Sequence, residues 1–496
     1  MRPILYTLTS SLHGEMAPDP RQEPFIRELE AALGTTFDCR GDLSFAGPSS
    51  SFAGLTGESP ALIYIRTGGT EGLFVERFRA AGFPPDADRP STPPIPGKGP
   101  VIRLLASGQS NSLAAAMEIL SWLRQRGIPG EILHGSPAAI AARIRAFADP
   151  AAAPTASPAA VPGAERAGSA PGGQDNGFPG AEKAGSAPGG ELTEAVGPEF
   201  LRQVQDGSGL TPDGRKRILE GMRFGVIGRP SDWLISSGVD YAAAREHLGA
   251  ELVDIPIEEL VAEARKQTPT ENLTGSGDTL GHENGPNPGQ PTQPKPLNKP
   301  KFGRKIDAED WQGALAIYEA LKALVARYRL DGLTLRCFDL LTALHNTGCL
   351  ALARLNAEGI TATCEGDIPA MLSMAVARAL TGRSSFQVNL SRIEGDRLLF
   401  AHCTVPLDIV RDYCYDTHFE SGIGVAIHGV LPEGPVTLFK ISPDFRRVFR
   451  RQARLVENTY GDNLCRTQVV VEAPGAAAYF LQEPIGNHHI IVPGKF

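Results

Sequence analysis

Hydrophobic positions along the chain change their spacing from one region to the next. In the first 149 residues, short apolar runs such as Ala61–Ile65 and Val101–Leu105 alternate with longer stretches, such as Pro24–Leu33 and 113–126. The short runs predict buried strands, and apolar residues recurring every three or four positions predict amphipathic helices. Strands that alternate with helices indicate a parallel sheet. We therefore predict an α/β domain at residues 1–149.

The same alternation returns in the middle of the chain. Apolar runs at 223–228 and 251–255 read as strands, while 241–248 and 308–329 have the helical period. We predict a second doubly wound α/β domain at residues 216–384.

The segment from Leu333 to Met374 contains the most informative pattern. One apolar run leads into Asp339, and a second, at 360–364, is followed directly by Glu365. Ligands bind at the carboxyl ends of parallel strands, so two carboxylates at neighbouring strand ends could hold a divalent cation or share acid–base chemistry.

Helix capping is the alternative for two of the acidic residues in this segment. Asp367 precedes a helix expected to begin near Pro369, and Asp339 could cap the helix that follows it. Glu365 follows an apolar strand and would need a partner if it were buried.

Short alternating runs dominate the last part of the chain. The pattern at 397–403, 424–428 and 435–440 predicts a mainly antiparallel, barrel-like β domain at residues 385–496. Near its end stand His488 and His489. Neighbouring strand residues point to opposite faces, so only one of the two histidines is expected to face a shared site.

Two segments have a composition that does not favour a packed core. Residues 150–215 are rich in Ala, Pro and Gly and contain the imperfect repeat GAERAGSAPGG and GAEKAGSAPGG; residues 268–302 form a polar, Pro- and Gly-rich insertion. We expect both segments to be disordered.

Composition excludes several classes of function. The net charge of −8 and pI near 5.8 give no general attraction to nucleic acid or to an anionic membrane. No apolar window reaches the roughly 18 residues of a membrane span. Seven cysteines without CxxC pairs favour reduced thiols. We expect a cytoplasmic protein without nucleic-acid or membrane partners.

Two turns in the first domain follow predicted strands. The glycine-rich turn at 66–72 and the polar turn at 107–112 both lie where α/β sheets bind ligands. Taken alone, Gly68 and Gly69 could only permit a tight turn, and Ser110 or Asn111 could only cap a helix.

The ordered parts of the chain resemble the L-fucose/L-arabinose isomerase-like proteins, including the fucose isomerase-like branch. The resemblance depends on the order of several motifs along the chain. These are RTGGTEG, NSLAAAMEIL, GRPSDWLISSG, RCFDLL, NAEGITATCEGDIPAMLSM, AHCTVP, HFESGIGVAIHG, VTLFKIS, CRTQ and GNHHIIVPG.

The resemblance implies a metal-dependent aldose–ketose isomerase that acts through an enediol on a pentose or deoxyhexose. Mn²⁺ would be held by Asp339, Glu365 and either His489 or His488. The two carboxylates would move the proton between C1 and C2. The family also implies a homo-oligomer, a trimer or a hexamer.

Three further residues are candidates to line the sugar pocket: Arg336, Asn487 and Trp233. Each has a structural alternative, namely a paired arginine, a turn asparagine and a core tryptophan.

The chain also departs from the family. Asp339 stands where the arabinose enzymes carry Glu, and Val388, Asn389 and Leu390 occupy a region where relatives often have an acidic residue or histidine. His402 at a strand end is more often structural than a ligand. These departures keep two alternatives open: a non-catalytic sugar-binding or regulatory protein on the same scaffold, and a structural assembly protein.

Overall fold

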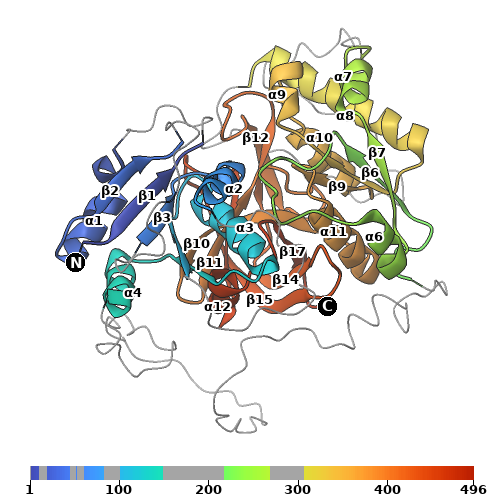
Figure 1. The fold of residues 1–496 in the computed structure, drawn as a ribbon. Helices are drawn as coiled ribbons and strands as arrows, with labels where there is room; N and C mark the ends of the chain where they lie inside the picture. The colour runs from blue at the N-terminus through green and yellow to red at the C-terminus, as the bar shows by residue number, and fades with distance from the viewer. Residues whose placement is uncertain are drawn as a thin grey trace, which may run out of the picture.

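The fold is taken from a computed structural model that describes residues 2–10, 19–44, 52, 61–82, 101–148, 217–267 and 306–496. Two parallel sheets with helices on their faces are joined to a closed antiparallel barrel (Figure 1). The predicted fold class is confirmed. The two segments predicted to be disordered, 150–215 and 268–302, lie outside the described residues.

The N-terminal domain is a doubly wound α/β unit. Its five parallel strands have the order β2-β1-β3-β4-β5. Helices α1 and α4 pack on one face and α2 and α3 on the other. The elements are β1 (Ile4–Leu8), a 3₁₀ turn (Pro20–Gln22), α1 (Pro24–Leu33), β2 (Asp38–Asp42), β3 (Ala61–Ile65), α2 (Glu71–Ala80), β4 (Ile102–Ala106), α3 (Ser112–Gln125), β5 (Gly130–Leu133) and α4 (Pro137–Ala148).

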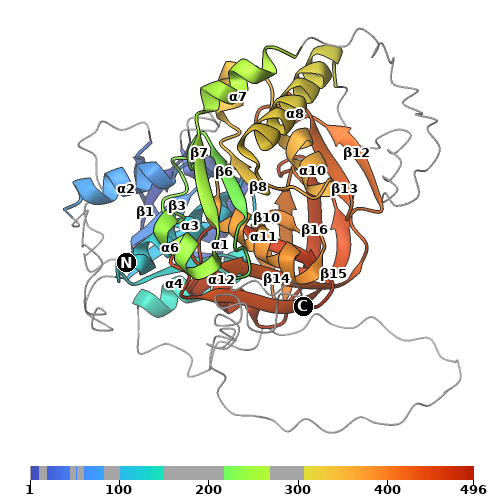
Figure 2. The ribbon, with the colours of Figure 1, turned by 90° about the vertical axis from the view of Figure 1, so that its right-hand side faces the viewer.

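The second domain has a four-stranded parallel sheet in the order β7-β6-β8-β9. Helices α6 and α11 cover one face, and α7, α8 and α10 cover the other (Figure 2). The elements are β6 (Arg223–Ile227), α6 (Tyr241–Leu248), β7 (Glu251–Ile255), α7 (Ile257–Ala264), α8 (Ala308–Tyr328), β8 (Gly332–Leu335), α9 (Asp339–Ala343), α10 (Cys349–Ala357), β9 (Thr361–Cys364) and α11 (Ile368–Thr381).

Six antiparallel strands close the barrel in the order β10-β11-β16-β15-β14-β17, and β17 pairs back with β10. A separate hairpin, β12-β13, packs beside it. The elements are β10 (Phe386–Glu394), β11 (Arg397–His402), β12 (Asp412–Asp416), β13 (Ala426–Val430), β14 (Gly434–Ile441), β15 (Val448–Thr459), β16 (Thr467–Glu472), α12 (Ala476–Gln482) and β17 (His489–Pro493).

Helix α3 joins the N-terminal domain to the barrel. It is buried on all sides from Ser112 to Leu123 and packs against β10. A helix buried on all faces belongs in an interior, and here one hydrophobic core runs from the N-terminal sheet into the barrel. This docking brings the carboxyl ends of β3 and β4 towards the barrel strands.

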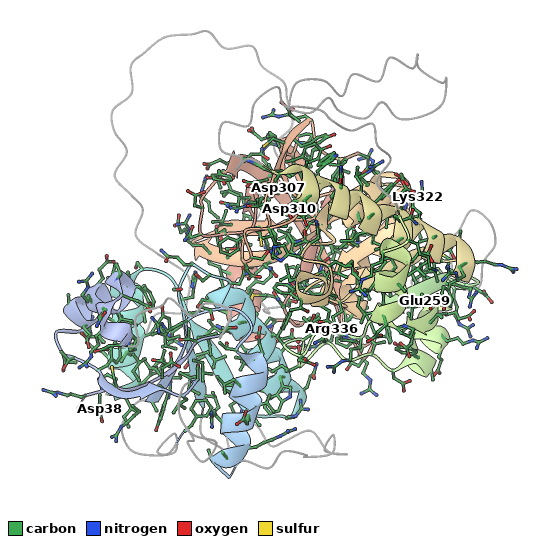
Figure 3. All side chains as sticks on the ribbon, turned by 90° about the horizontal axis from the view of Figure 1, so that it is seen from above. Asp38, Glu259, Asp307, Asp310, Lys322 and Arg336 are labelled. Carbon is green, nitrogen blue, oxygen red and sulfur yellow. The ribbon has the colours of Figure 1, made fainter. Side chains whose placement is uncertain are left out.

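Helix α8 connects the second domain to the hairpin. Asp307 caps the helix by accepting a hydrogen bond from the Asp310 N–H, and the Asp310 carboxylate accepts one from the Gly424 N–H at 2.8 Å (Figure 3). The hairpin loop is thereby fixed beside the second sheet. Within the described residues, no helix combines the length and apolar character needed to cross a membrane.

Candidate functional site

Glu365 occupies a constrained turn directly after β9. It has φ +64°, and Gly366 follows with φ +70°. A non-glycine residue in this left-handed region costs roughly 1–2 kcal/mol, and such strain is concentrated at functional sites. The Glu365 carbonyl accepts a hydrogen bond from the Ser231 N–H at 3.0 Å, which fixes the turn against the loop after β6.

Two histidines from the barrel meet Glu365. His402 ends β11, and His488 directly precedes β17. Glu365 Oε1 lies 3.3 Å from His488 Nε2 and 3.9 Å from His402 Nε2. One side-chain nitrogen or oxygen atom from each of the three residues lies within 4.8 Å of the other two, so the three could hold one metal ion.

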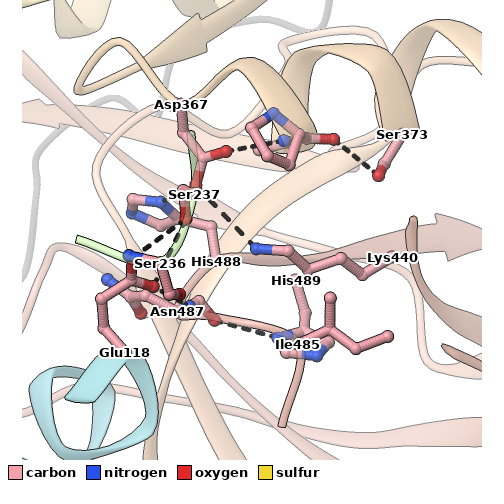
Figure 4. Close-up of polar contacts among 12 residues, drawn as sticks. Glu118, Ser236, Ser237, Asp367, Ser373, Lys440, Ile485, Asn487, His488 and His489 are labelled. Atoms are coloured by element: carbon pink, nitrogen blue, oxygen red, sulfur yellow. Dashed lines mark hydrogen bonds and ion pairs between the residues drawn. The ribbon is translucent and has the colours of Figure 1, made fainter. Parts of the chain in front are cut away.

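Neighbouring side chains orient the members of this group. Trp233 donates its indole N–H to Glu365 Oε2 at 2.6 Å, which leaves Oε1 on the histidine side. His488 Nδ1 lies 2.9 Å from Asp367 Oδ2 (Figure 4). His402 Nδ1 lies 2.9 Å from the Thr404 hydroxyl. In both histidines Nδ1 thus has a polar partner, and Nε2 is the nitrogen nearer to the Glu365 carboxylate.

The electrostatics of the group follow from burial and charge. Burial by itself would raise the pKa of Glu365, but His488, His402 and the indole N–H hold it below its ordinary value. Burial disfavours the charged form of His488, yet the carboxylates of Glu365 and Asp367 raise its pKa to about 10. Burial and the neighbouring His488 lower the pKa of His402 to about 4. The group therefore holds an ionised carboxylate beside one charged and one neutral imidazole at neutral pH.

A cavity of about 400 Å³, its mouth included, opens above Glu365. All three parts of the fold and the β12–β13 loop contribute to its wall. Its lining residues are Gly68, Gly69, Glu71, Asn111, Ala114, Ala115, Trp233, Phe338, Glu365, Asn389, Glu420 and Asn487. Both turns that sequence analysis singled out in the first domain therefore reach the cavity.

Hydrogen-bonding capacity is left unused on this wall. The amide oxygens of Asn111, Asn389 and Asn487 and Oε2 of Glu71 are buried without a hydrogen-bond partner in the described part of the chain. Buried polar atoms are normally satisfied. Four unpaired acceptors around one cavity indicate a ligand that supplies several donors.

Two further carboxyl groups on the wall are held in the protonated form more readily than usual. Burial, with the nearby charge of Glu365, raises the pKa of Glu420 to about 8, and Asn111 donates its side-chain N–H to Glu420 at 2.9 Å. Burial also raises the pKa of Glu71 well above its ordinary value. Carboxyl groups with such environments are candidates for acid–base work.

Asp339, expected as a metal ligand, is not part of the three-residue group. The Nε–H of Arg336 is shared between the two oxygens of the Asp339 carboxylate, each at 3.0 Å, and Arg336 also pairs with Asp232 at 2.7 Å. Arg336, expected in the sugar pocket, is therefore the paired arginine of the alternative interpretation and is absent from the cavity lining. Asp339 and Arg336, three residues apart, thus form a local ion pair, and neither is among the cavity's lining residues.

The structure separates the two adjacent histidines. His489 faces the barrel core, where its Nδ1–H donates to the Asn487 carbonyl and its Nε2 accepts from the Tyr479 hydroxyl, each at 2.9 Å. Burial lowers its pKa well below the ordinary value. His488 is the histidine that meets Glu365, so His489 is not placed to join it. Two other expected pocket residues, Trp233 and Asn487, do line the cavity.

Several site residues were not selected from the sequence. The sequence pattern favours a structural role for His402 and marks Asn389 only as a departure from the family. Glu420 lies in the motif HFESGIGVAIHG, but no local pattern distinguishes its carboxyl group from a surface one. These residues come from loops and strands far apart in sequence, so only their packing reveals the site.

The residues present fit a divalent cation. His488 Nε2 is buried and has no hydrogen-bond partner in the described part of the chain, although Glu365 Oε1 lies only 3.3 Å away. An unsatisfied imidazole nitrogen beside a buried carboxylate oxygen leaves both atoms available as ligands of one ion. One carboxylate oxygen and two imidazole nitrogens suit Mn²⁺ as well as other divalent transition metals.

The fold and this group of residues define an α/β protein with a carboxylate–imidazole site at the junction with a β-barrel. No protein-family model matches the chain. Part of the chain is similar to a sulfoquinovose isomerase of Clostridium sp. (strain MSTE9), with 25% identity over 194 residues, which is 36% of this chain and 42% of that protein. The sulfoquinovose isomerases of Priestia aryabhattai and Priestia megaterium (strain ATCC 12872 / QMB1551) are 25% identical over 186 residues, covering 35% of this chain and 42% of theirs. The match thus spans less than half of each relative, and it relates about a third of this chain to sugar isomerases.

Proposed function

We propose that this chain is a divalent-cation-dependent aldose–ketose isomerase that acts on an uncharged pentose or deoxyhexose, with Mn²⁺ as the cation. The observation that carries the proposal is the convergence of Glu365, His402 and His488 beside a cavity with four unpaired acceptors. The similarity of part of the chain to sulfoquinovose isomerases supports the reaction class.

Glu365, His402 and His488 would hold the cation through Oε1, Nε2 and Nε2. When bound, a divalent cation supplies charge stabilisation to the sugar oxygens whose electron density rises during isomerisation. Trp233 keeps the Glu365 carboxylate in its orientation through the bond to Oε2.

The cavity wall would bind the open-chain sugar. Each of the amide oxygens of Asn111, Asn389 and Asn487 can accept a hydrogen bond from a sugar hydroxyl. Trp233 and Phe338, which pack edge to face with ring centroids 4.9 Å apart, supply an apolar wall for the C–H face of the substrate. Correct placement of C1 and C2 is expected to contribute a large share of the rate acceleration.

Movement of a proton between C1 and C2 needs a group that exchanges protons near neutral pH. Glu420 has that property, because burial and Glu365 raise its pKa to about 8. We therefore assign the proton-transfer step to the carboxyl group of Glu420, in place of Glu365 and Asp339, to which the family resemblance assigns it. Glu71 would hold a substrate hydroxyl through its unpaired Oε2.

The side chains of the wall favour an uncharged substrate. Glu71, Glu365 and Glu420 line the cavity, and neither Lys nor Arg is among its described lining residues. Sulfoquinovose, the sugar in the relatives' names, carries a sulfonate group, and the described lining residues offer no cationic side chain to pair with it. We accordingly expect substrates without a sulfonate, phosphate or carboxylate group.

Metal analysis of the Glu365→Gln variant tests the proposal. Glutamine keeps the size of the side chain but removes the charged ligand, so we expect the purified variant to retain less than a tenth of the Mn²⁺ of the unaltered protein. Ketose formation from a panel of pentoses and deoxyhexoses should fall below detection. The control is Glu319→Gln, at an exposed position on α8. Failure of the unaltered, Mn²⁺-loaded protein to convert any sugar in the panel would refute the proposal.

A non-catalytic sugar-binding role is the second candidate, and one observation favours it. The three-residue group contains one carboxylate, Glu365, whereas the family pattern implied two. In that case a sugar would raise the melting temperature without being converted, and removal of the cation with a chelator would leave sugar binding unchanged.

A further inference from the structure

Both carboxylate oxygens of Asp367 have separate partners. Oδ1 accepts a hydrogen bond from the Ala370 N–H at 2.7 Å, which caps α11. Oδ2 lies 2.9 Å from Nδ1 of His488 (Figure 4). A helix cap uses only one side-chain oxygen. The second oxygen therefore has a role beyond the start of the helix.

That role follows from hydrogen-bond chemistry. A carboxylate oxygen can only accept, so the proton must lie on His488 Nδ1. Without a cation the ring is charged and Nε2 is protonated as well; where a cation takes the place of the Nε2 proton, Nε2 carries the lone pair, 3.3 Å from Glu365 Oε1. An imidazole binds a cation only through an unprotonated nitrogen. Asp367 thus selects the form of His488 that can be a ligand.

A buried lysine accompanies this carboxylate. The Lys440 side chain is 0% exposed, and its Nζ lies 4.0 Å from Asp367 Oδ2 (Figure 4). Nζ has no hydrogen-bond partner in the described part of the chain. A buried ammonium group of this kind is costly unless it offsets a nearby negative charge.

Helix α11 also holds the part of β14 that carries Lys440. Ser373 donates its hydroxyl to the Pro369 carbonyl at 2.7 Å, and the same oxygen accepts the Ile441 N–H at 2.9 Å. Strand β14 is therefore attached to the first turns of the helix that Asp367 caps. This attachment holds the ammonium group beside the carboxylate.

We infer that Asp367 and Lys440 are positioning residues for the cation site: Asp367 directs the Nε2 lone pair of His488 towards the ion, and Lys440 holds Asp367 in place. The inference rests on the proposed function, since it presupposes a cation between Glu365, His402 and His488.

Calorimetric titration of Mn²⁺ into the metal-free Asp367→Asn variant tests this inference. Asparagine still caps a helix through its amide oxygen. Its N–H₂ group, however, would donate to His488 Nδ1, so that the proton moves to Nε2. We expect Mn²⁺ affinity to fall 10- to 100-fold, as for other partners of metal-binding histidines, with an unchanged far-ultraviolet circular dichroism spectrum. The matched control is Asp307→Asn, the same exchange at the cap of α8, which should bind Mn²⁺ like the unaltered protein.

The Lys440→Met variant provides a second measurement. Methionine fills the buried volume without the charge, and we expect several-fold weaker Mn²⁺ binding. Equal affinity in Asp367→Asn and the unaltered protein would overturn the inference and leave the proposed function standing. Absence of Mn²⁺ binding by the unaltered protein would overturn the cation site and the inference with it. If both variants lost stability but kept the same Mn²⁺ affinity, their role would be structural and the inference wrong.

Discussion

Hydrogen-bond partners determine what each buried histidine can do. His488 is held by a carboxylate and faces Glu365, whereas His489 is held by a backbone carbonyl and a tyrosine hydroxyl. His134 is a third case: its Nδ1–H donates to the Ala106 carbonyl at 2.9 Å, and its Nε2 accepts the Ile393 N–H at 3.1 Å. His134 thus links the N-terminal sheet to the barrel, and it can do so only as a neutral ring.

His134 should make stability depend on pH. Burial lowers its pKa to about 4, while the unfolded chain has the ordinary value of 6.5. Above pH 6.5 both states are neutral and the full contribution is present. Between pH 6.5 and 4 the unfolded state takes up a proton that the folded state does not, so about 2–3 kcal/mol is lost as the pH falls.

Urea unfolding at pH 7 and pH 5 measures this effect. The unaltered protein should lose more stability between the two values than the His134→Leu variant, because leucine cannot titrate. Equal losses in the two proteins would show that His134 does not contribute.

Among the secondary-structure elements, the short turns at strand ends position the site residues. Glu365 and Gly366 both have positive φ, which reverses the chain between β9 and α11. A Cβ atom at Gly366 would meet the Arg229 carbonyl oxygen and lie 2.8 Å from Pro230 Cα. The loop after β6 and the turn after β9 therefore touch through backbone atoms, and glycine is required between them.

Replacing Gly366 should distort this junction. We expect Gly366→Ala to destabilise the protein by about 2–4 kcal/mol, from left-handed strain and from steric overlap with rigid backbone. Denaturant unfolding measures the loss, and Mn²⁺ binding should weaken because Glu365 moves. Gly238→Ala is the control, since its Cβ would meet nothing within 4 Å. The argument fails if both variants unfold at the same denaturant concentration.

Across the whole molecule, one buried carboxylate joins three parts of the chain. Glu118 on α3 accepts hydrogen bonds from the Ser236 N–H at 2.6 Å, the Ser237 hydroxyl at 3.1 Å and the Asn487 N–H at 2.8 Å (Figure 4). Asn487 directly precedes His488, so the packing of the N-terminal domain is coupled to the candidate site.

Removal of this carboxylate should weaken the junction. Glu118→Ala leaves three buried donors unpaired, and we expect a loss of about 3–5 kcal/mol. Urea unfolding followed by circular dichroism would measure it, with Glu76→Ala on the exposed side of α2 as the control. Similar midpoints for the two variants would contradict the role assigned to Glu118.

Assembly into a trimer or hexamer and a cytoplasmic location stay predictions. Light scattering of the purified protein after size-exclusion chromatography would determine the number of subunits.

The sequence by itself determined the classes of element and their order. Hydrophobic periodicity is a local property, so the strands at Ala61–Ile65 and Glu251–Ile255 and the helix at Pro24–Leu33 were recognised with their observed bounds. The cap at Asp367 was also predictable, because Asp followed by Pro at the helix start is a short-range signal. Glu365 was selected because a carboxylate at the end of a buried strand needs a partner.

Only the tertiary structure decided which side chains share the site. Arg336 lies three residues from Asp339 and pairs with it, and one residue of register separates His488 from His489. His402 and Glu420 reach the site from elements whose position depends on closure of the barrel and on docking of the hairpin. Local spacing specifies the direction of a side chain relative to its own element. The group that it meets depends on how separate elements pack, because burial and charge at the site are properties of the assembled fold.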